Sequence, residues 1–165
     1  MAANTSRLAD FLPYLLSVTS NAVSDSIAEE YRARFGLNIP DWRVMAVLGD
    51  SGPKTQRELA SATRMDKVAV NRACKGLEDR KLAARSPNAS DGRSHHLELT
   101  GAGRAMHGEI MPLALEMERR LFTTLTTAER SQFKALLARI AEQVRALEGT
   151  RVDDPENLVS KGTSV

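Results

Sequence analysis

Apolar residues recur at helical spacing through most of the chain. The first such segment, residues 8–35, predicts a long helix that Asp10 caps and that Gly36 ends, because glycine takes the left-handed conformation at a helix C-terminus without a Cβ penalty. Asn38 can cap the next helix, which stops at the breaker run 49–53. The stripe of the first helix consists of Phe11, Leu12, Leu15, Val18, Ala22, Val23 and Ile27.

The C-terminal part of the chain, residues 101–148, predicts two further helices. Thr100 can cap the first of them, and Pro112 inside it should produce a kink. A capping box at residues 126–129 opens the second, which Gly149 is expected to close.

The central segment, residues 54–100, has shorter elements. Residues 55–58 form a capping box, so a helix should start at Gln56. It gives way to a turn at about residues 63–65, and Asp66 is an N-cap residue type that signals a second start. The spacing therefore predicts a helix-turn-helix.

The second of these short helices has two different faces. Val70, Ala73, Cys74 and Leu77 share the inward one. On the outward face, asparagine and arginine can pair with adenine and guanine edges in a major groove, whereas lysines suit phosphates. An ordinary solvated surface is the alternative. With the first residue of the preceding helix, the candidates for contact with DNA are Gln56, Lys67, Val68, Asn71, Arg72 and Lys75.

A β-hairpin is predicted directly after the helix pair, over residues 83–99, with a turn-rich stretch at 87–92. Arg93 leaves the tip of this hairpin, where a guanidinium can enter a narrow minor groove, and Asp91 could support it. His95, further along the strand, could contact phosphate. The alternative is an ordinary surface Asp and Arg at a turn. A helix-turn-helix followed by such a hairpin is the layout of a winged helix.

The charge distribution fits this interpretation better than the overall charge of +2 does. Residues 54–104 hold 11 Lys and Arg against 6 Asp and Glu, a net charge of +5, whereas the remainder has a net charge of −3. Basic charge is thus concentrated in the central segment, which favours a phosphate-bearing partner there.

The hairpin tip Asp91-Gly92-Arg93, followed by residues 97–100 (Leu-Glu-Leu-Thr) and Gly103, resembles the wing signature of the MarR family of bacterial transcriptional regulators. The resemblance covers roughly residues 8–148, in matching element order. It implies a mainly α fold with a small β-wing: a winged helix-turn-helix domain with N- and C-terminal dimerisation helices.

Some features depart from the family pattern. A Thr-Arg pair that is common near the start of the recognition helix is replaced around residues 70–72, so operator preference does not carry over. Arg64 occupies a turn position where glycine is preferred. The branch that senses hydroperoxides uses a cysteine near the N-terminus, which this chain lacks, and thiol sensing through Cys74 is therefore not expected.

The resemblance implies a homodimeric repressor that binds a pseudo-palindromic operator in double-stranded DNA. A small aromatic or phenolic effector, or a coenzyme A thioester, would release it. Tyr14, Trp42 and Arg43 are candidates to line the effector pocket, since an aromatic ring and a cation suit an aromatic acid; each is alternatively core or ordinary surface. A transcriptional activator of the same fold and a winged-helix protein-interaction module without DNA binding remain open alternatives.

Nothing in the sequence indicates an enzyme or a cofactor. His95 and His96 are adjacent on a strand and point to opposite faces, which is unsuitable for two ligands of one metal, and His107 stands alone on a helix. Neither a glycine-rich phosphate loop nor a nucleophile elbow is present. No metal site and no catalytic residue is expected.

The domain prediction is a single regulator domain over residues 1–150, with dimerisation helices at 8–35 and 101–148, and a polar, mobile tail at 151–165. No apolar run has membrane-spanning length, no secretory signal is evident, and one cysteine excludes an intramolecular disulfide. A soluble cytoplasmic protein with no membrane partner is expected.

Overall fold

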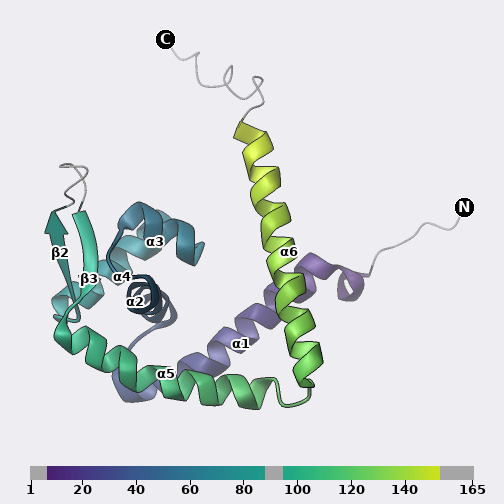
Figure 1. Ribbon diagram of the computed structural model, residues 1–165, viewed down its shortest axis with the longest axis horizontal. Helices are drawn as coiled ribbons and strands as arrows, with labels where there is room; N and C mark the ends of the chain where they lie inside the picture. Colours follow the sequence, from purple (N-terminus) through teal and green to yellow (C-terminus); the bar gives the residue numbers. More distant parts are fainter. Residues whose placement is uncertain (1–6, 88–94, 153–165) are drawn as a thin grey trace, which may run out of the picture. The chain divides into compact units, whose positions relative to one another are not determined.

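The computed structural model describes residues 7–87 and 95–152, which are mostly helical (Figure 1). The chain divides into two compact units, Met1–Arg119 and Arg120–Val165. The elements are η1 (Leu8–Asp10), α1 (Leu12–Phe35), α2 (Ile39–Ser51), β1 (Lys54–Thr55), α3 (Gln56–Thr63), α4 (Lys67–Asp79), β2 (Ala83–Pro87), β3 (His95–Leu99), α5 (Gly101–Leu121) and α6 (Thr127–Val152). Long helices with one small sheet confirm the predicted fold class.

That residues 1–150 act as a single regulator domain stays a prediction. The same holds for the mobile tail at 151–165, of which residues 153–165 lie outside the described part of the chain.

Most helix boundaries follow the local signals in the sequence. Asn38 and Asp41 form a capping box at the start of α2, in which the Asp41 backbone N–H donates to Asn38 Oδ1 at 2.9 Å. Gly36, with φ 63°, ends α1 in the left-handed region. At the start of α5, the Gly103 N–H donates to Thr100 Oγ1 at 3.1 Å, and the capping box at Thr126 and Glu129 opens α6.

Two predicted boundaries are wrong. Asp10 does not cap α1, because it lies in η1 with its own N–H bonded to the Arg7 carbonyl, and α1 starts after Phe11 without a side-chain cap. Gly149 does not end α6, which continues to Val152. A glycine inside a helix costs only about 1 kcal/mol relative to alanine, so it does not stop a helix by itself.

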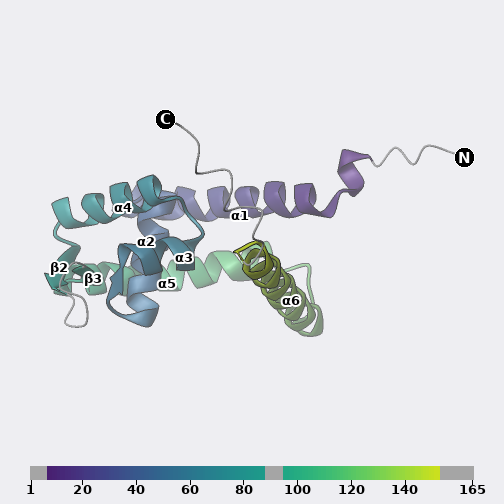
Figure 2. The same ribbon diagram turned by 90° about the horizontal axis from the view of Figure 1, so that it is seen from above.

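The sheet is antiparallel, with strand order β1-β3-β2. The β2 and β3 strands form the predicted hairpin, with Ala83 opposite Leu99 and Pro87 opposite His95. The β1 strand, which pairs Lys54 with Leu97, was not predicted, since two residues carry no detectable alternation. Figure 2 shows the strands β2 and β3 beside α2 and α4.

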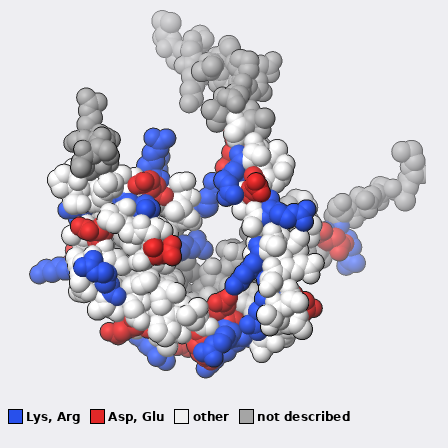
Figure 3. Space-filling model, viewed as in Figure 1, with Lys and Arg blue, Asp and Glu red and all other residues white. Residues whose placement is uncertain are grey.

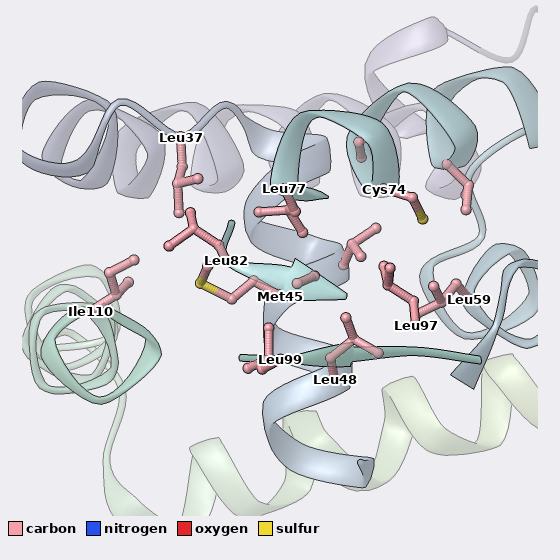
Figure 4. Close-up of a cluster of buried hydrophobic side chains, with 14 of the residues drawn as sticks. Leu37, Met45, Leu48, Leu59, Cys74, Leu77, Leu82, Leu97, Leu99 and Ile110 are labelled. Carbon is pink, nitrogen blue, oxygen red and sulfur yellow. The ribbon is translucent and has the colours of Figure 1, made fainter. Parts of the chain in front are cut away.

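The core of the first unit lies between these elements (Figure 4). All four residues predicted for the inward face of α4 are buried. In Figure 4 the side chains of Cys74 and Leu77 point toward those of α2 and β3. Other members of this cluster are Leu37, Met45, Leu48, Leu59, Leu82, Leu97, Leu99 and Ile110.

The first turn of α5 is pressed against the start of the hairpin. The Thr100 backbone N–H donates to the Leu82 carbonyl at 3.0 Å, and the Thr100 hydroxyl donates to the Lys81 carbonyl at 2.7 Å. A Cβ at Gly103 would overlap the Leu82 carbonyl group, whose carbon would be only 2.9 Å away. This close approach is a physical reason for glycine after the Leu-Thr motif.

We expect Gly103→Ala to destabilise the fold by about 1–3 kcal/mol, because the added methyl group displaces backbone rather than a flexible side chain. Gly101→Ala is a matched control in the same helical turn, since a Cβ there meets nothing within 4 Å. Urea unfolding followed by circular dichroism measures both. Equal stability of the two variants would contradict the packing at Gly103.

Cys74 is fully buried, and burial raises the pKa of its thiol to about 11. The thiol is therefore protonated at neutral pH, whereas only the thiolate reacts quickly with alkylating agents. We expect iodoacetamide to label Cys74 at least tenfold more slowly, by an order-of-magnitude estimate, in the folded protein than in urea. Mass spectrometry follows both reactions, and similar rates in the two states would show that the thiol is accessible.

Candidate nucleic-acid interface

The outward face of α4 is built on a well-defined helix start. Asp66 is the N-cap, and its Oδ1 accepts from the Ala69 backbone N–H at 2.8 Å. Because the opposite face of the helix is buried in the core, the outward residues are held facing solvent. All five candidates of this helix are exposed: Lys67, Val68, Asn71, Arg72 and Lys75.

The turn before α4 contains a backbone conformation that is unusual for its residue. Arg64 has φ 56°, in the left-handed region, where the sequence pattern favours glycine. The Thr63 side chain supports the turn: its hydroxyl donates to the Leu59 carbonyl at 2.7 Å and accepts from the Met65 N–H at 3.4 Å. The helix-turn-helix geometry therefore forms without the glycine.

A hydrogen bond joins the two helices on their outer surface. Gln56, the first residue of α3, donates from Nε2 to Asn71 Oδ1 at 3.0 Å. The Thr55–Glu58 capping box fixes the backbone at Gln56, and hydrogen bonds from the Thr55 N–H and hydroxyl hold the pKa of the Glu58 carboxyl below its ordinary value. Sequence reasoning named both Gln56 and Asn71 but not their contact, because they are 15 positions apart.

The described part of the hairpin places one predicted residue beside this helix pair. His95 is exposed at the start of β3 and, with Gln56 and Cys74, lines a small hollow. Arg85 of β2, which was not predicted, binds Glu78 at the end of α4, with 2.8 and 2.9 Å from Nε to the two carboxylate oxygens. Arg93 and its supporting residue Asp91 lie outside the described residues.

Charged side chains of both signs are scattered over the face of the molecule shown in Figure 3. In this view the Lys and Arg side chains lie among Asp and Glu side chains and do not form one continuous patch. The cations on the outward face of α4 are Lys67, Arg72 and Lys75. Cations on one exposed helix face can contact phosphates on either side of a groove.

The predicted effector residues do not form one cluster. Trp42 packs between Tyr31 of α1 and His107 of α5, with ring centroids 5.8 Å apart in both pairs. Arg43 donates to Ser24 Oγ at 3.3 Å. Tyr14 is exposed and lies 17 residues from Tyr31 along α1, a distance of about 25 Å at the rise of an α-helix.

His107 was treated as isolated in the sequence, yet it is a packing residue. A Cβ on Gly49 of α2 would be 2.5 Å from its Nε2, so the imidazole lies directly against the α2 backbone. Tyr31 is buried, and desolvation raises the pKa of its phenol. Together with Trp42, these rings fill the junction between α2 and the helices α1 and α5. No sequence signal linked Tyr31 to the effector candidates.

Arg80 makes another unpredicted contact, at the C-terminal end of α1. It follows α4, and its guanidinium donates to the carbonyl of Phe35 at 2.7 Å and to that of Gly36 at 3.1 Å. A cation at these terminal carbonyls is favoured by the partial negative charge of a helix C-terminus. The end of α1 is thereby linked to the end of α4.

Among the residues that the structure describes, no group of three or more His, Cys, Asp and Glu could hold a metal ion. None of the described helices is long and apolar enough to cross a membrane.

Comparison with known proteins identifies the relatives of this chain. Residues 35–94 match the model of the MarR family. A probable transcriptional regulator from Pseudomonas aeruginosa is similar in structure, with 30% identity, a TM-score of 0.70 and coverage of 81% of this chain and 99% of that one.

Two further relatives add detail. BpsR of Bordetella bronchiseptica, whose DNA binding is regulated by 6-hydroxynicotinic acid, is 27% identical, with a TM-score of 0.70 over 79% of this chain and 98% of that one. The HTH-type transcriptional repressor Rv2887 of Mycobacterium tuberculosis is 29% identical over 105 residues, 64% of this chain and 76% of the relative. With the winged-helix fold and the exposed α4 face, these matches show that the chain belongs to the MarR family of DNA-binding transcriptional regulators.

Proposed function

We propose that this chain is a homodimeric repressor that binds a pseudo-palindromic operator and is released from it by a small aromatic acid. The observation that carries the proposal is the exposed α4 face, which is cationic and amide-bearing and is backed by a buried core. Since the operator would lie on the bacterial chromosome, we propose that the protein acts in the cytoplasm.

In the proposed complex, α4 enters the major groove, which admits an α-helix. Asn71 and Arg72 contact base edges, and Lys67 and Lys75 contact flanking phosphates. Val68, whose residue surface is 66% exposed, suits the methyl group of a thymine. His95 and Arg93 of the wing would extend the contact along the backbone and into the neighbouring minor groove.

Exposed apolar surface in each unit supports the dimer. Leu12 of α1 is 75% exposed, and Phe11 and Leu16 are also exposed. In α6 no residue of the stretch 127–149 is buried, yet five apolar residues follow one helix face. Burial against a second copy would remove such stripes from water. The five residues of α6 are Phe133, Leu136, Ile140, Val144 and Leu147.

Two observations support release by an aromatic acid. One is the relative BpsR, in which 6-hydroxynicotinic acid regulates DNA binding. The other is Arg43, which is only partly buried, donates to Ser24 Oγ at 3.3 Å and could instead pair with a carboxylate. A ligand bound there would change the equilibrium between the DNA-binding state and the released state if it had a higher affinity for the released state.

We expect Arg72→Ala to lower the affinity for the operator and relax discrimination at one base position by about 1–3 kcal/mol, since a bidentate guanine contact is lost. Lys75→Ala should weaken all sequences alike and reduce the salt slope by about 1. Fluorescence anisotropy with DNA from upstream of the gene measures both, with the exposed Arg139→Ala of α6 as control.

Footprinting of the same DNA should show two half-sites about one helical turn apart. Absence of salt-dependent DNA affinity would instead favour a protein-interaction module.

We expect 6-hydroxynicotinate or a similar aromatic carboxylate to weaken operator binding by about 5- to 150-fold, the usual range of allosteric coupling. Trp42 is the single tryptophan, so its fluorescence reports ligand binding directly. Arg43→Ala should reduce the response while leaving ligand-free DNA affinity unchanged. An aliphatic carboxylate serves as the control for charge, and an equal response to both acids would argue against an aromatic site.

A further inference from the structure

We propose that Gln56 and Asn71 act as one base-recognition unit, in which Gln56 orients the Asn71 amide toward an adenine. The inference rests on the proposed binding of DNA by α4 and deepens it. Asn71 would touch the base, and Gln56 would be a positioning residue that acts through it.

The contact that defines the unit joins two different helices. Gln56 Nε2 lies 3.0 Å from Asn71 Oδ1, and Asn71 is exposed to solvent. Both backbones are held firmly: the Thr55–Glu58 capping box fixes the first turn of α3, and Val70 and Ala73, at 1% and 2% exposure, anchor α4 on either side of Asn71. The packing of α3 against α4 therefore places the two amides in contact in the protein without DNA.

The direction of this hydrogen bond determines what Asn71 presents to a groove. Because Gln56 donates, the carbonyl end of the Asn71 amide faces Gln56, and its two N–H donors are left for another partner. The carbonyl oxygen keeps a second lone pair. Adenine offers an acceptor at N7 and a donor at N6 on its major-groove edge. It can therefore accept from an Asn71 N–H and donate to the second lone pair of the Asn71 carbonyl oxygen.

Gln56 lies at the border between α3 and the sheet. It is only partly exposed and borders the small hollow that His95 and Leu97 of β3 also line. A side chain that already makes a hydrogen bond in the free protein loses less rotamer freedom when DNA binds, and the same bond restricts Asn71. An exposed bond between neutral amides adds little to folding, because water competes for both partners. We therefore expect the bond to affect the discrimination between bases rather than the free energy of unfolding.

The test uses the full chain and three variants: Gln56→Met, Asn71→Ala and the double variant. Methionine keeps the length and helix propensity of glutamine but removes the amide. Selection from a pool of random duplexes identifies the preferred site, and anisotropy then gives the affinity for each single-base substitution of that site. Thermal unfolding is recorded for every variant.

We expect each single variant to lose the preference for adenine at the same base position, by roughly 5- to 100-fold, the fold-change that corresponds to one bidentate pair. The double variant should discriminate no worse than Asn71→Ala, because both substitutions remove one unit. The unfolding temperature of Gln56→Met should equal that of the unmodified chain. Lys75→Ala, from the same helix face, should lower affinity for all sequences equally.

Three results would overturn the inference. In the first, Gln56→Met keeps the full adenine preference; in the second, it changes a different base position; in the third, its effect adds to that of Asn71→Ala. Each of these leaves the proposed function intact, since the protein still binds DNA. If the unmodified chain showed no salt-dependent affinity for any duplex, the proposed function itself would fail. Gln56→Ala provides a second removal of the amide and should reproduce the result for methionine.

Discussion

Burial of the inward face of α4 is the constraint on which the rest of the structure depends. Val70, Cys74 and Leu77 are almost fully removed from water between α2, α3 and β3. With that face fixed, the outward residues have one possible orientation, because a helix cannot rotate without exposing its core side chains. The face that we propose to contact DNA is thus oriented by side chains that are themselves buried.

The same core also fixes how neighbouring helices meet α4. The Arg80 guanidinium holds the terminal carbonyls of α1, and the stacked rings of Trp42 and His107 fill the space between α2 and α5. Gly49 allows the imidazole to lie against the α2 backbone. A polar contact thus joins the end of α1 to the end of α4, and an aromatic contact joins α2 to α5.

Local signals predicted local structure well. The caps at Thr55, Asp66, Asn38 and Thr126 involve partners three positions apart, so the sequence itself contains the whole interaction. Asp10 failed as a cap because a short turn, η1, precedes α1 and places the start of the helix later.

Contacts between distant parts of the chain could not be predicted in this way. Arg80 and Phe35 are 45 positions apart, and only the packing of α4 against the rest of the core brings them together. The Gln56–Asn71 bond depends likewise on the crossing of α3 and α4. The outward face of α4 was predicted because periodicity separates inside from outside, whereas the partners of each exposed residue are a property of the tertiary structure. The roles of Arg93 and Asp91 at the hairpin tip stay predictions.

The small sheet has a consequence for how the protein behaves at high concentration. Unpaired strand edges can recruit strands from other molecules and so begin aggregation. Here β1 offers only two residues to such a partner, and β2 ends in Pro87, which has no backbone N–H to donate. The strand between them, β3, has neighbours on both sides. The two edge strands thereby offer fewer backbone groups for intermolecular strand addition than long, proline-free strands would.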